Sequence, residues 1–257
     1  NGNEEWVQNF GGEYHDTGYS VEQTSDGGYI VIGNQDNPET FIPLQPMLIK
    51  TNNSGELEWV QFFNDPSPYP WYGYFVEQTS DNGYVFGGSC SEGVMGSYLI
   101  KTDVSGVEEW RAFLWGDEVR DVEQTNDGGY VLCGYIDNSE TDSDDIYLVE
   151  LNSDGNAQWV EIFGGIETPF GLIDDENEYG YSIEKTIDGG FVICGDTRYS
   201  QFNTDIFLLK TFGGTVSTIE LPTPTSKREL IKTTNILGKE NTTIKNQPMI
   251  EIYDDGS

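Results

Sequence analysis

The sequence predicts an all-β fold made of four repeated sheets, and three observations support this prediction. A turn segment occurs four times, as VEQTSDGGYIVIG, VEQTSDNGYVFGG, VEQTNDGGYVLCG and IEKTIDGGFVICG. A second segment alternates with it and is typified by MLIKTNNSGELEW and YLIKTDVSGVEEW. Four tryptophans mark the same period, because Trp6, Trp59, Trp110 and Trp159 are 53, 51 and 49 residues apart. A fixed period of this length indicates a repeat architecture.

Each unit divides into four strands by residue alternation and turn chemistry. The first strand is of the YSVEQT type and ends in an Asp-Gly or Asn-Gly turn, where glycine supplies the positive φ of a tight hairpin. GYIVIG gives the second strand, YLIKT the third and ELEWVQFF the fourth. Four-stranded units joined by tight hairpins at this period fit the blades of a four-bladed β-propeller.

The two ends of the repeat array predict how the propeller closes. The chain starts with NGNEEWVQNF, which matches a lone fourth strand, and the last repeat ends at Thr211 after three strands. We therefore expect the N-terminal strand to complete the last blade, because closure removes exposed sheet edges. A larger ring built from several chains is the alternative.

Composition changes along the chain and predicts three parts. Residues 1–217 form the propeller repeats, and residues 218–226 form a linker in which Pro222 and Pro224 favour an extended chain. Residues 227–257 form a short β-rich tail with the strand-like pieces RELIKTTNILGKE and PMIEIYDDGS. We expect a domain boundary near residue 218.

Net charge limits the class of partner. The chain has 45 acidic and 12 basic residues, which gives a formal charge of −33. Such a charge repels phosphate backbones and anionic lipids, so nucleic acid is a poor partner, and the apolar runs are too short for a transmembrane segment. The same charge suits solubility, salty surroundings or bound divalent cations.

The repeats also resemble a known group of proteins. The EQTxDGGYxxxG and LIKTxxxGxxxW pairs resemble the repeat units of secreted, Asp-rich β-propeller proteins of marine Bacteroidota, over residues 1–217. The tail, with LIKTTNILGKE and then IEIYDDG, is similar to the C-terminal sorting domain of the type IX secretion system, although the further basic strand that normally ends such tails is missing. This resemblance implies an extracellular or cell-surface location. Neither match names a ligand.

Aromatic residues in the second irregular connection are candidate ligand contacts. In a blade of this kind the irregular connections share one face, and variable loops on a rigid scaffold are where binding residues concentrate. The segment NDPSPYPWYGY offers Tyr69, Trp71, Tyr72 and Tyr74. These rings either stack on sugar rings or pack together as a rigid loop.

Two groups of carboxylates are candidate ligands for Ca²⁺. The acidic loops contribute Asp142, Asp144, Asp145, Asp174 and Asp175, and the equivalent positions of the four inner strands contribute Glu22, Glu77, Glu123 and Glu184. The alternatives are solvated acidic loops, and glutamates that bond to backbone or to the adjacent glutamine. No EF-hand spacing is present.

These features favour a secreted or cell-surface module that binds an extracellular glycan or protein through its irregular loops. His15 is the single histidine, and no GxSxG or HExxH motif is present, so the sequence predicts no catalytic residue. One alternative is an enzyme that acts on polysaccharide with two loop carboxylates as acid and base. Another is a building block of an extracellular assembly.

Overall fold

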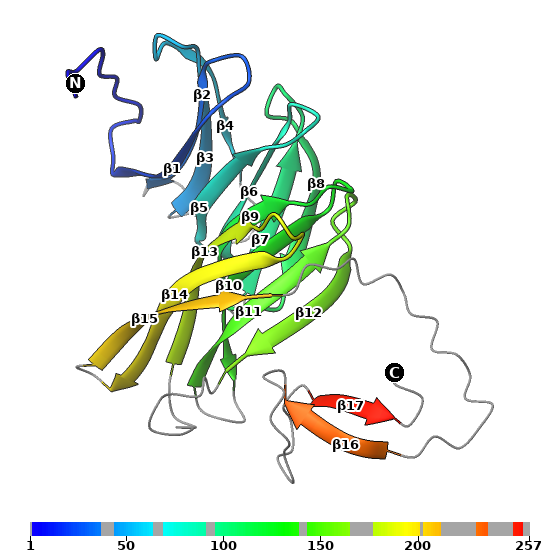
Figure 1. Cartoon of the computed structure of the whole chain (residues 1–257). Coiled ribbons are helices and arrows are strands. Elements are labelled where there is room, and N and C mark those ends of the chain that lie inside the picture. The colour runs from blue at the N-terminus through cyan, green and yellow to red at the C-terminus, as the bar shows by residue number, and fades with distance from the viewer. Residues whose placement is uncertain are drawn as a thin grey trace. The chain divides into compact units, whose positions relative to one another are not determined.

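The computed structural model shows a chain in two units, residues 1–213 and residues 214–257. It describes residues 2–36, 44–63, 69–90, 96–138, 143–164, 177–200, 203–211, 230–235 and 249–253. All regular structure in these ranges is β-strand (Figure 1). The described part of the chain has no helix long and apolar enough to span a membrane.

The first unit contains four antiparallel sheets, each formed by strands that follow one another in the sequence. The first sheet contains β1 (Asp16–Gln23), β2 (Tyr29–Asp36), β3 (Leu44–Thr51) and β4 (Leu57–Phe62). The second contains β5 (Trp71–Gln78), β6 (Tyr84–Cys90), β7 (Gly96–Thr102) and β8 (Glu108–Leu114). The third contains β9 (Glu118–Gln124), β10 (Tyr130–Asn138), β11 (Ser143–Leu151) and β12 (Ala157–Phe163).

The fourth sheet contains three strands among the described residues, β13 (Asn177–Lys185), β14 (Phe191–Ser200) and β15 (Asn203–Lys210). The predicted all-β fold with four antiparallel blades is therefore confirmed. In the second unit, β16 (Leu230–Asn235) and β17 (Met249–Tyr253) pair as an antiparallel hairpin. The predicted linker at 218–226 lies outside the described residues.

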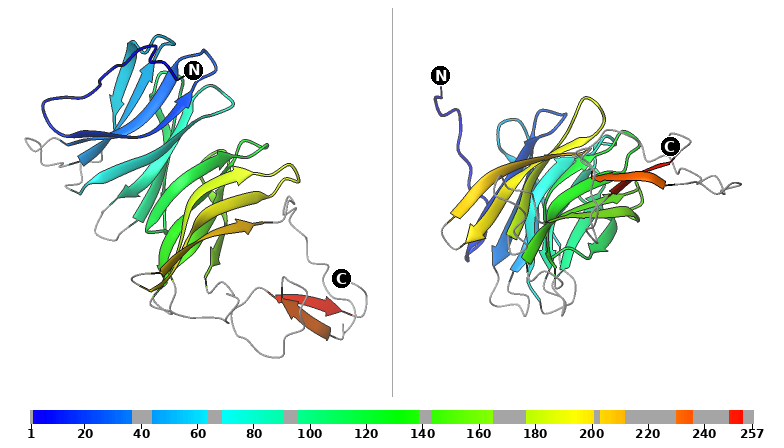
Figure 2. Two further views of the ribbon diagram at one scale, coloured as in Figure 1. Left: turned by 60° about the vertical axis from the view of Figure 1, so that its left-hand side comes forward. Right: turned by 60° about the horizontal axis from the view of Figure 1, so that its bottom comes forward.

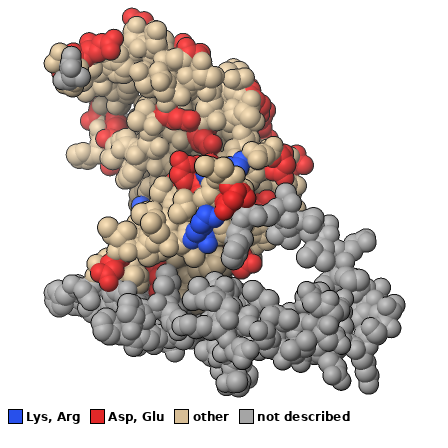
Figure 3. Space-filling model, in the orientation of Figure 1, with Lys and Arg blue, Asp and Glu red and all other residues tan. Residues whose placement is uncertain are grey.

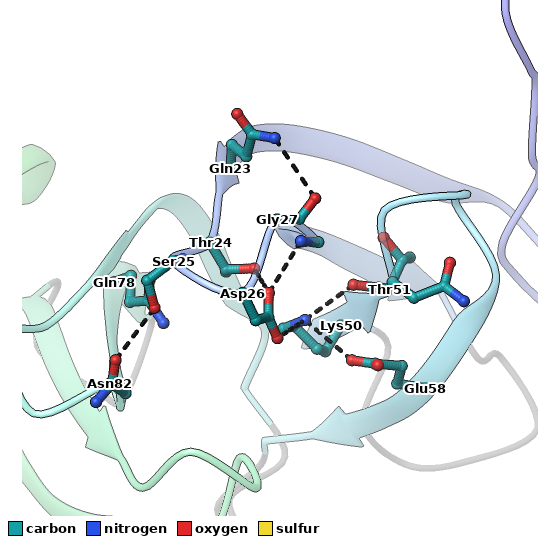
Figure 4. Close-up of polar contacts among 12 residues, drawn as sticks. Gln23, Thr24, Ser25, Asp26, Gly27, Lys50, Thr51, Glu58, Gln78 and Asn82 are labelled. Carbon is teal, nitrogen blue, oxygen red and sulfur yellow. Dashed lines mark hydrogen bonds and ion pairs between the residues drawn. The ribbon is translucent and has the colours of Figure 1, made fainter.

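The repeated turn motif forms the same hydrogen bonds in successive sheets. In the first sheet, Asp26 accepts a bond from the Gly28 amide at 2.9 Å, which caps the turn between β1 and β2. Lys50 on β3 then donates to Asp26 and to Glu58 on β4, at 2.9 Å each (Figure 4). Its side chain is only 3% exposed, so one buried ammonium joins β3, β4 and the turn between β1 and β2.

Successive sheets pack face to face through apolar clusters (Figure 2). Ile30 and Leu48 of the first sheet lie in one cluster with Trp71 and Phe86 of the second. Two similar clusters join the second sheet to the third and the third to the fourth. This burial of inner faces supplies the main favourable contribution to the folding of the repeat array.

The repeated Glu-Gln pair links neighbouring sheets at their inner strands. The amide of Gln78 in the second sheet donates to Glu22 of the first, and the Gln78 side chain accepts from the Ser25 amide at 2.7 Å. Gln124 in the third sheet accepts from the Ser80 amide of the second at 2.8 Å in the same way. The motif therefore positions one blade on the next.

The expected closing strand is not formed. Residues 2–10 have no strand conformation, and β13, β14 and β15 pair only with one another among the described residues. Trp6 lies instead against Tyr29 of the first sheet, with ring centroids 5.6 Å apart. The predicted pairing with β15 is therefore not seen among the described residues, and the N-terminal segment packs on the first sheet.

Candidate functional site

Each inner strand carries a β-bulge at the same repeat position. The bulge residues lie three positions before the glutamate of the Glu-Gln pair, and the register of each first hairpin skips one of them: Tyr19, Tyr74, Arg120 and Tyr181. The glycine in the neighbouring strand makes the bulge possible, because a Cβ at Gly88 or Gly134 would lie 1.9 Å from a carbonyl oxygen. Bulges redirect side chains and are frequent next to functional sites.

The bulge side chains contact one another from sheet to sheet. Tyr19 and Tyr74 meet edge to face with centroids 5.5 Å apart. The Arg120 guanidinium lies over the Tyr74 ring at 4.8 Å and over the Tyr181 ring at 5.8 Å. One row of side chains therefore crosses all four sheets, and contacts between a guanidinium and aromatic rings add to its rigidity.

Further tyrosines widen this row. Tyr72 stacks on Tyr74 at 6.1 Å, and Tyr179 stacks on Tyr181 at 6.3 Å. Tyr135 meets Tyr179 at 4.9 Å, and the Arg198 guanidinium lies 4.4 Å from the centre of the Tyr179 ring. We call this surface the tyrosine–arginine band, and it consists of Tyr19, Tyr72, Tyr74, Arg120, Tyr135, Tyr179, Tyr181 and Arg198.

The band lies at the connection end of the sheets, opposite the tight turns. Its inner-strand residues belong to the first halves of β1, β5, β9 and β13, whose far ends lead into the Asp-Gly and Asn-Gly turns. Tyr19 is 50% exposed and Tyr181 38%, and the other tyrosines of the band are half-buried. Stacked, partly exposed rings form a platform that a ligand can reach.

Carboxylates border the band and hold its polar groups. Tyr179 donates a 2.6 Å hydrogen bond to Asp144, and Tyr135 donates to Glu118 at 3.2 Å. Glu118 also forms an ion pair with Arg120, and Asp196 forms one with Arg198 at 3.7 Å. The charges of both arginines are therefore compensated locally.

Burial affects the ionisation of these groups. Burial and the neighbouring Glu118 raise the pKa of Tyr135 to about 12. Burial also raises the pKa values of Tyr74 and Tyr181, and it raises the pKa of Glu118. These phenols are therefore neutral near pH 7 and can both donate and accept hydrogen bonds.

The structure separates the four predicted aromatic contacts. Tyr72 and Tyr74 belong to the band, and Tyr69 is 44% exposed in the segment before β5. Trp71 is only 1% exposed and packs against Tyr98 at 4.8 Å. The expectation of an exposed ring at Trp71 is corrected, because alternation along β5 turns this side chain into the core.

The predicted acidic loops are only partly described. Asp142, Asp174 and Asp175 lie outside the described residues. Asp145 is buried and accepts a 2.6 Å hydrogen bond from the Asn138 amide, while Asp144 holds Tyr179. Both described carboxylates therefore bind neighbouring side chains, and calcium binding by these loops remains a prediction.

The four equivalent glutamates line the inner strands. Glu22 and Glu77 accept bonds from the backbone amides of Gln78 and Gln124 in the next sheet, and Glu123 bonds to Glu184. Burial and then the charge of Glu123 raise the pKa of Glu77 to about 8. No group of three or more potential ligand residues within the described ranges is arranged to hold a metal ion. The axial metal remains a prediction, whereas the backbone bonding is observed.

Sequence reasoning missed Arg120, Arg198 and the tyrosines at 19, 135, 179 and 181. The signal for three of these positions was present in the repeats, because Tyr19, Tyr74, Arg120 and Tyr181 share one place before the glutamate. Three tyrosines and one arginine at an otherwise repeated position suggest a shared surface. The bulge that brings them into a row depends on register, which the sequence pattern did not reveal.

Acidic side chains dominate the surface in general. Figure 3 shows them spread over the face in view, with few basic side chains among them. Local pairing of Arg120 and Arg198 with carboxylates gives the band little excess positive charge. A strongly anionic ligand would therefore meet a repulsive field.

No protein-family model matches the chain, and no curated protein matches its sequence. Among solved structures, an endo-arabinase from Bacteroides thetaiotaomicron matches with a TM-score of 0.49 and 13% identity, over 92% of this chain and 93% of that one. The β-propeller domain of the Trilobed protease from Pyrococcus furiosus matches with a TM-score of 0.46 and 9% identity, over 77% of this chain and 55% of that one. A xylan β-1,4-xylosidase from Bacillus halodurans matches with a TM-score of 0.45 and 13% identity, over 76% and 41%. The chain thus spans about half the length of the Pyrococcus chain.

Proposed function

We propose that the protein is a binding module whose tyrosine–arginine band holds a neutral or weakly charged glycan. The observation that carries this proposal is the row of bulge side chains, Tyr19, Tyr74, Arg120 and Tyr181, which crosses all four sheets. The extracellular or cell-surface setting of this glycan rests on the resemblance of the repeats to secreted proteins.

The chemistry of the band supports a polyhydroxylated ligand. Tyrosine offers a large flat apolar face, suited to the C–H faces of a sugar ring, and a hydroxyl that pairs with a sugar hydroxyl. It loses little conformational entropy when it binds, since only two side-chain torsions are fixed. Glu118, Asp144 and Asp196 at the border accept hydrogen bonds from further hydroxyls.

Two exposed tyrosines test the proposal without disturbing the core. Tyr19→Ala and Tyr181→Ala each remove a partly exposed ring from the row, and Phe62→Ala on β4 is a matched control with 45% exposure outside the band. We expect a glycan array to identify a bound polysaccharide, and each tyrosine variant to weaken binding about fivefold, in line with about 1 kcal/mol for one stacking contact. The control should bind as the wild type does.

The outcomes separate the possible functions. Equal binding by the wild type and both tyrosine variants would exclude the band as the site. A hydrolysis assay on the same glycans distinguishes a binding module from an enzyme, because release of reducing ends would favour acid–base chemistry by two carboxylates. An array without any bound glycan would reject the proposed ligand class.

A further inference from the structure

Each fourth-strand tryptophan packs on the sheet that follows. Trp59 of the first sheet meets Tyr84 of the second at 5.8 Å, and Trp110 of the second meets Tyr130 of the third at 5.7 Å. Trp6 meets Tyr29 of the first sheet at 5.6 Å, in the same relation. Residues 3–10, NEEWVQNF, therefore lie on the first sheet where the fourth strand of a preceding sheet would lie.

Glycines in the turns between third and fourth strands confirm this equivalence. A Cβ at Gly55 would lie 2.7 Å from the Trp6 ring, and one at Gly106 would lie 2.8 Å from the Trp59 ring. Gly155 has the same relation to Trp110. The N-terminal segment thus makes the side-chain contacts of a fourth strand although no third strand is paired with it in the described residues.

The fourth sheet has the complementary feature, an uncovered face beside β15. Ile206 and Leu208 are 84% and 72% exposed, whereas the equivalent Ile146 and Leu148 of the third sheet are fully buried. Ile187, in the turn of the same sheet, is also fully exposed. In the third sheet this face is covered by the fourth sheet, so among the described residues the fourth sheet lacks both a following sheet on this face and a partner for its edge strand β15.

The charges at this edge match the N-terminal segment. Lys50 and Lys101 each bind two carboxylates at 2.9 Å, one in the turn and one on the fourth strand just before the tryptophan, and both lysines are nearly buried. The equivalent Lys210 binds Asp188 in the turn and is 51% exposed. Glu5 precedes Trp6 as Glu58 precedes Trp59, so Glu5 is the carboxylate that matches Lys210.

We propose that residues 3–10 of a second copy of this chain add to β15 as the fourth strand of the fourth sheet. The register of the other sheets, in which Lys50 faces Trp59 and Leu48 faces Gln61, then places Trp6 opposite Lys210 and Gln8 opposite Leu208. The same register brings Glu5 to Lys210.

A second copy is the occupant because the two surfaces lie apart in one chain. Each sheet packs on the next one in the sequence, and Figure 1 shows β15 and the N-terminal segment at different ends of this series. Residues 3–10 keep their contacts with their own first sheet while their free edge meets β15 of another copy. A head-to-tail interface of this kind generates a ring or an open filament of copies.

Cross-linking between two single-cysteine chains tests the pairing. Both chains carry Cys194→Ser, because Cys194 is exposed and lies opposite Leu208 on the neighbouring strand. The remaining cysteines, Cys90 and Cys133, are buried. One chain carries Gln8→Cys and the other Leu208→Cys, and they are mixed under mild oxidation in about 0.15 M salt, which screens the net charge. We expect a disulfide-linked heterodimer. Val104 lies in an exposed turn of the second sheet, and a mixture of the Gln8→Cys and Val104→Cys chains should give no disulfide-linked heterodimer.

The alternatives give different products. If the double variant Gln8→Cys, Leu208→Cys forms a disulfide within one chain while the mixed single variants do not cross-link, the ring closes internally and the second copy is excluded. If neither experiment gives this disulfide, residues 3–10 are not the missing strand.

Charge reversal gives an independent measurement. In sedimentation velocity, Glu5→Lys should weaken self-association about tenfold. Adding Lys210→Glu to Glu5→Lys should restore self-association. Glu4→Lys, which makes the same charge change on the other side of the strand, should weaken self-association less than Glu5→Lys does. Self-association unchanged by Glu5→Lys, or a wild type that stays monomeric at all concentrations, would overturn the proposal.

Discussion

Glu77 makes the stability of the protein depend on pH, and Glu77→Gln tests this. One carboxylate oxygen of Glu77 is buried without a hydrogen-bond partner among the described residues, and the charges of Glu123 and Glu22 lie nearby. Burial is the main reason why the pKa of this carboxyl is raised to about 8. The folded protein therefore holds a proton that the unfolded chain releases above its ordinary pKa of 4.5.

The sign of the effect follows from proton linkage. Because the pKa of Glu77 is raised by folding, its contribution to stability is fully present below about pH 4.5 and is lost as the pH rises toward 8. Each pH unit in this window costs about 1 kcal/mol of unfolding free energy, or roughly 3 kcal/mol between pH 5 and pH 8. Glutamine keeps an oxygen that accepts from the Gln124 amide and does not titrate.

Urea unfolding at pH 5, 6, 7 and 8, followed by tryptophan fluorescence, measures the effect. We expect Glu77→Gln to match the wild type near pH 5 and to exceed it increasingly toward pH 8. Glu13→Gln, at an exposed glutamate, is the control and should parallel the wild type. Parallel pH profiles for Glu77→Gln and the wild type would refute the assignment of a bound proton to Glu77.

Two further predictions concern the framework. Lys101→Met should destabilise the protein by about 2 kcal/mol, because it removes a nearly buried ammonium from two carboxylates, whereas Lys210→Met should cost less than about 1 kcal/mol in the dilute monomer. Equal losses in urea unfolding would contradict this. Trp71→Ala should lower the free energy of unfolding by about 3 to 5 kcal/mol, because it truncates a core side chain, and Tyr69→Ala should change it little. A melting temperature of Trp71→Ala close to that of the wild type would show that the ring is not part of the core.

The repeat period and the turn chemistry were enough to predict the four sheets. Asp26 and Gly28 form the predicted capped turn, and the same bonds recur at Asp81 and Gly83 in the second sheet. These features are local, so they can be read from short segments of sequence. The Glu-Gln pair was visible too, and bonding of its glutamate to backbone was one of the predicted alternatives.

The features that sequence reasoning missed depend on register and on contacts between sheets. Alternation along β5 turns Trp71 into the core and places Tyr72 and Tyr74 on the other side, and the bulge at Tyr74 shifts the alternation only for the residues that follow it. The N-terminal segment matched a fourth strand in sequence, but the pattern could not show which sheet it would contact. Its Trp6 packs forward on the first sheet, as Trp59 does on the second.

Hydrogen exchange with and without the glycan identified by the array tests the central claim most directly. If the tyrosine–arginine band holds the ligand, amides around residues 72–74, 118–120 and 179–181 should exchange more slowly in the complex. The tight turns at 24–28 and 79–83, at the opposite end of the sheets, should be unaffected. Protection confined to those turns, or to the outer strands β4 and β8, would contradict the account.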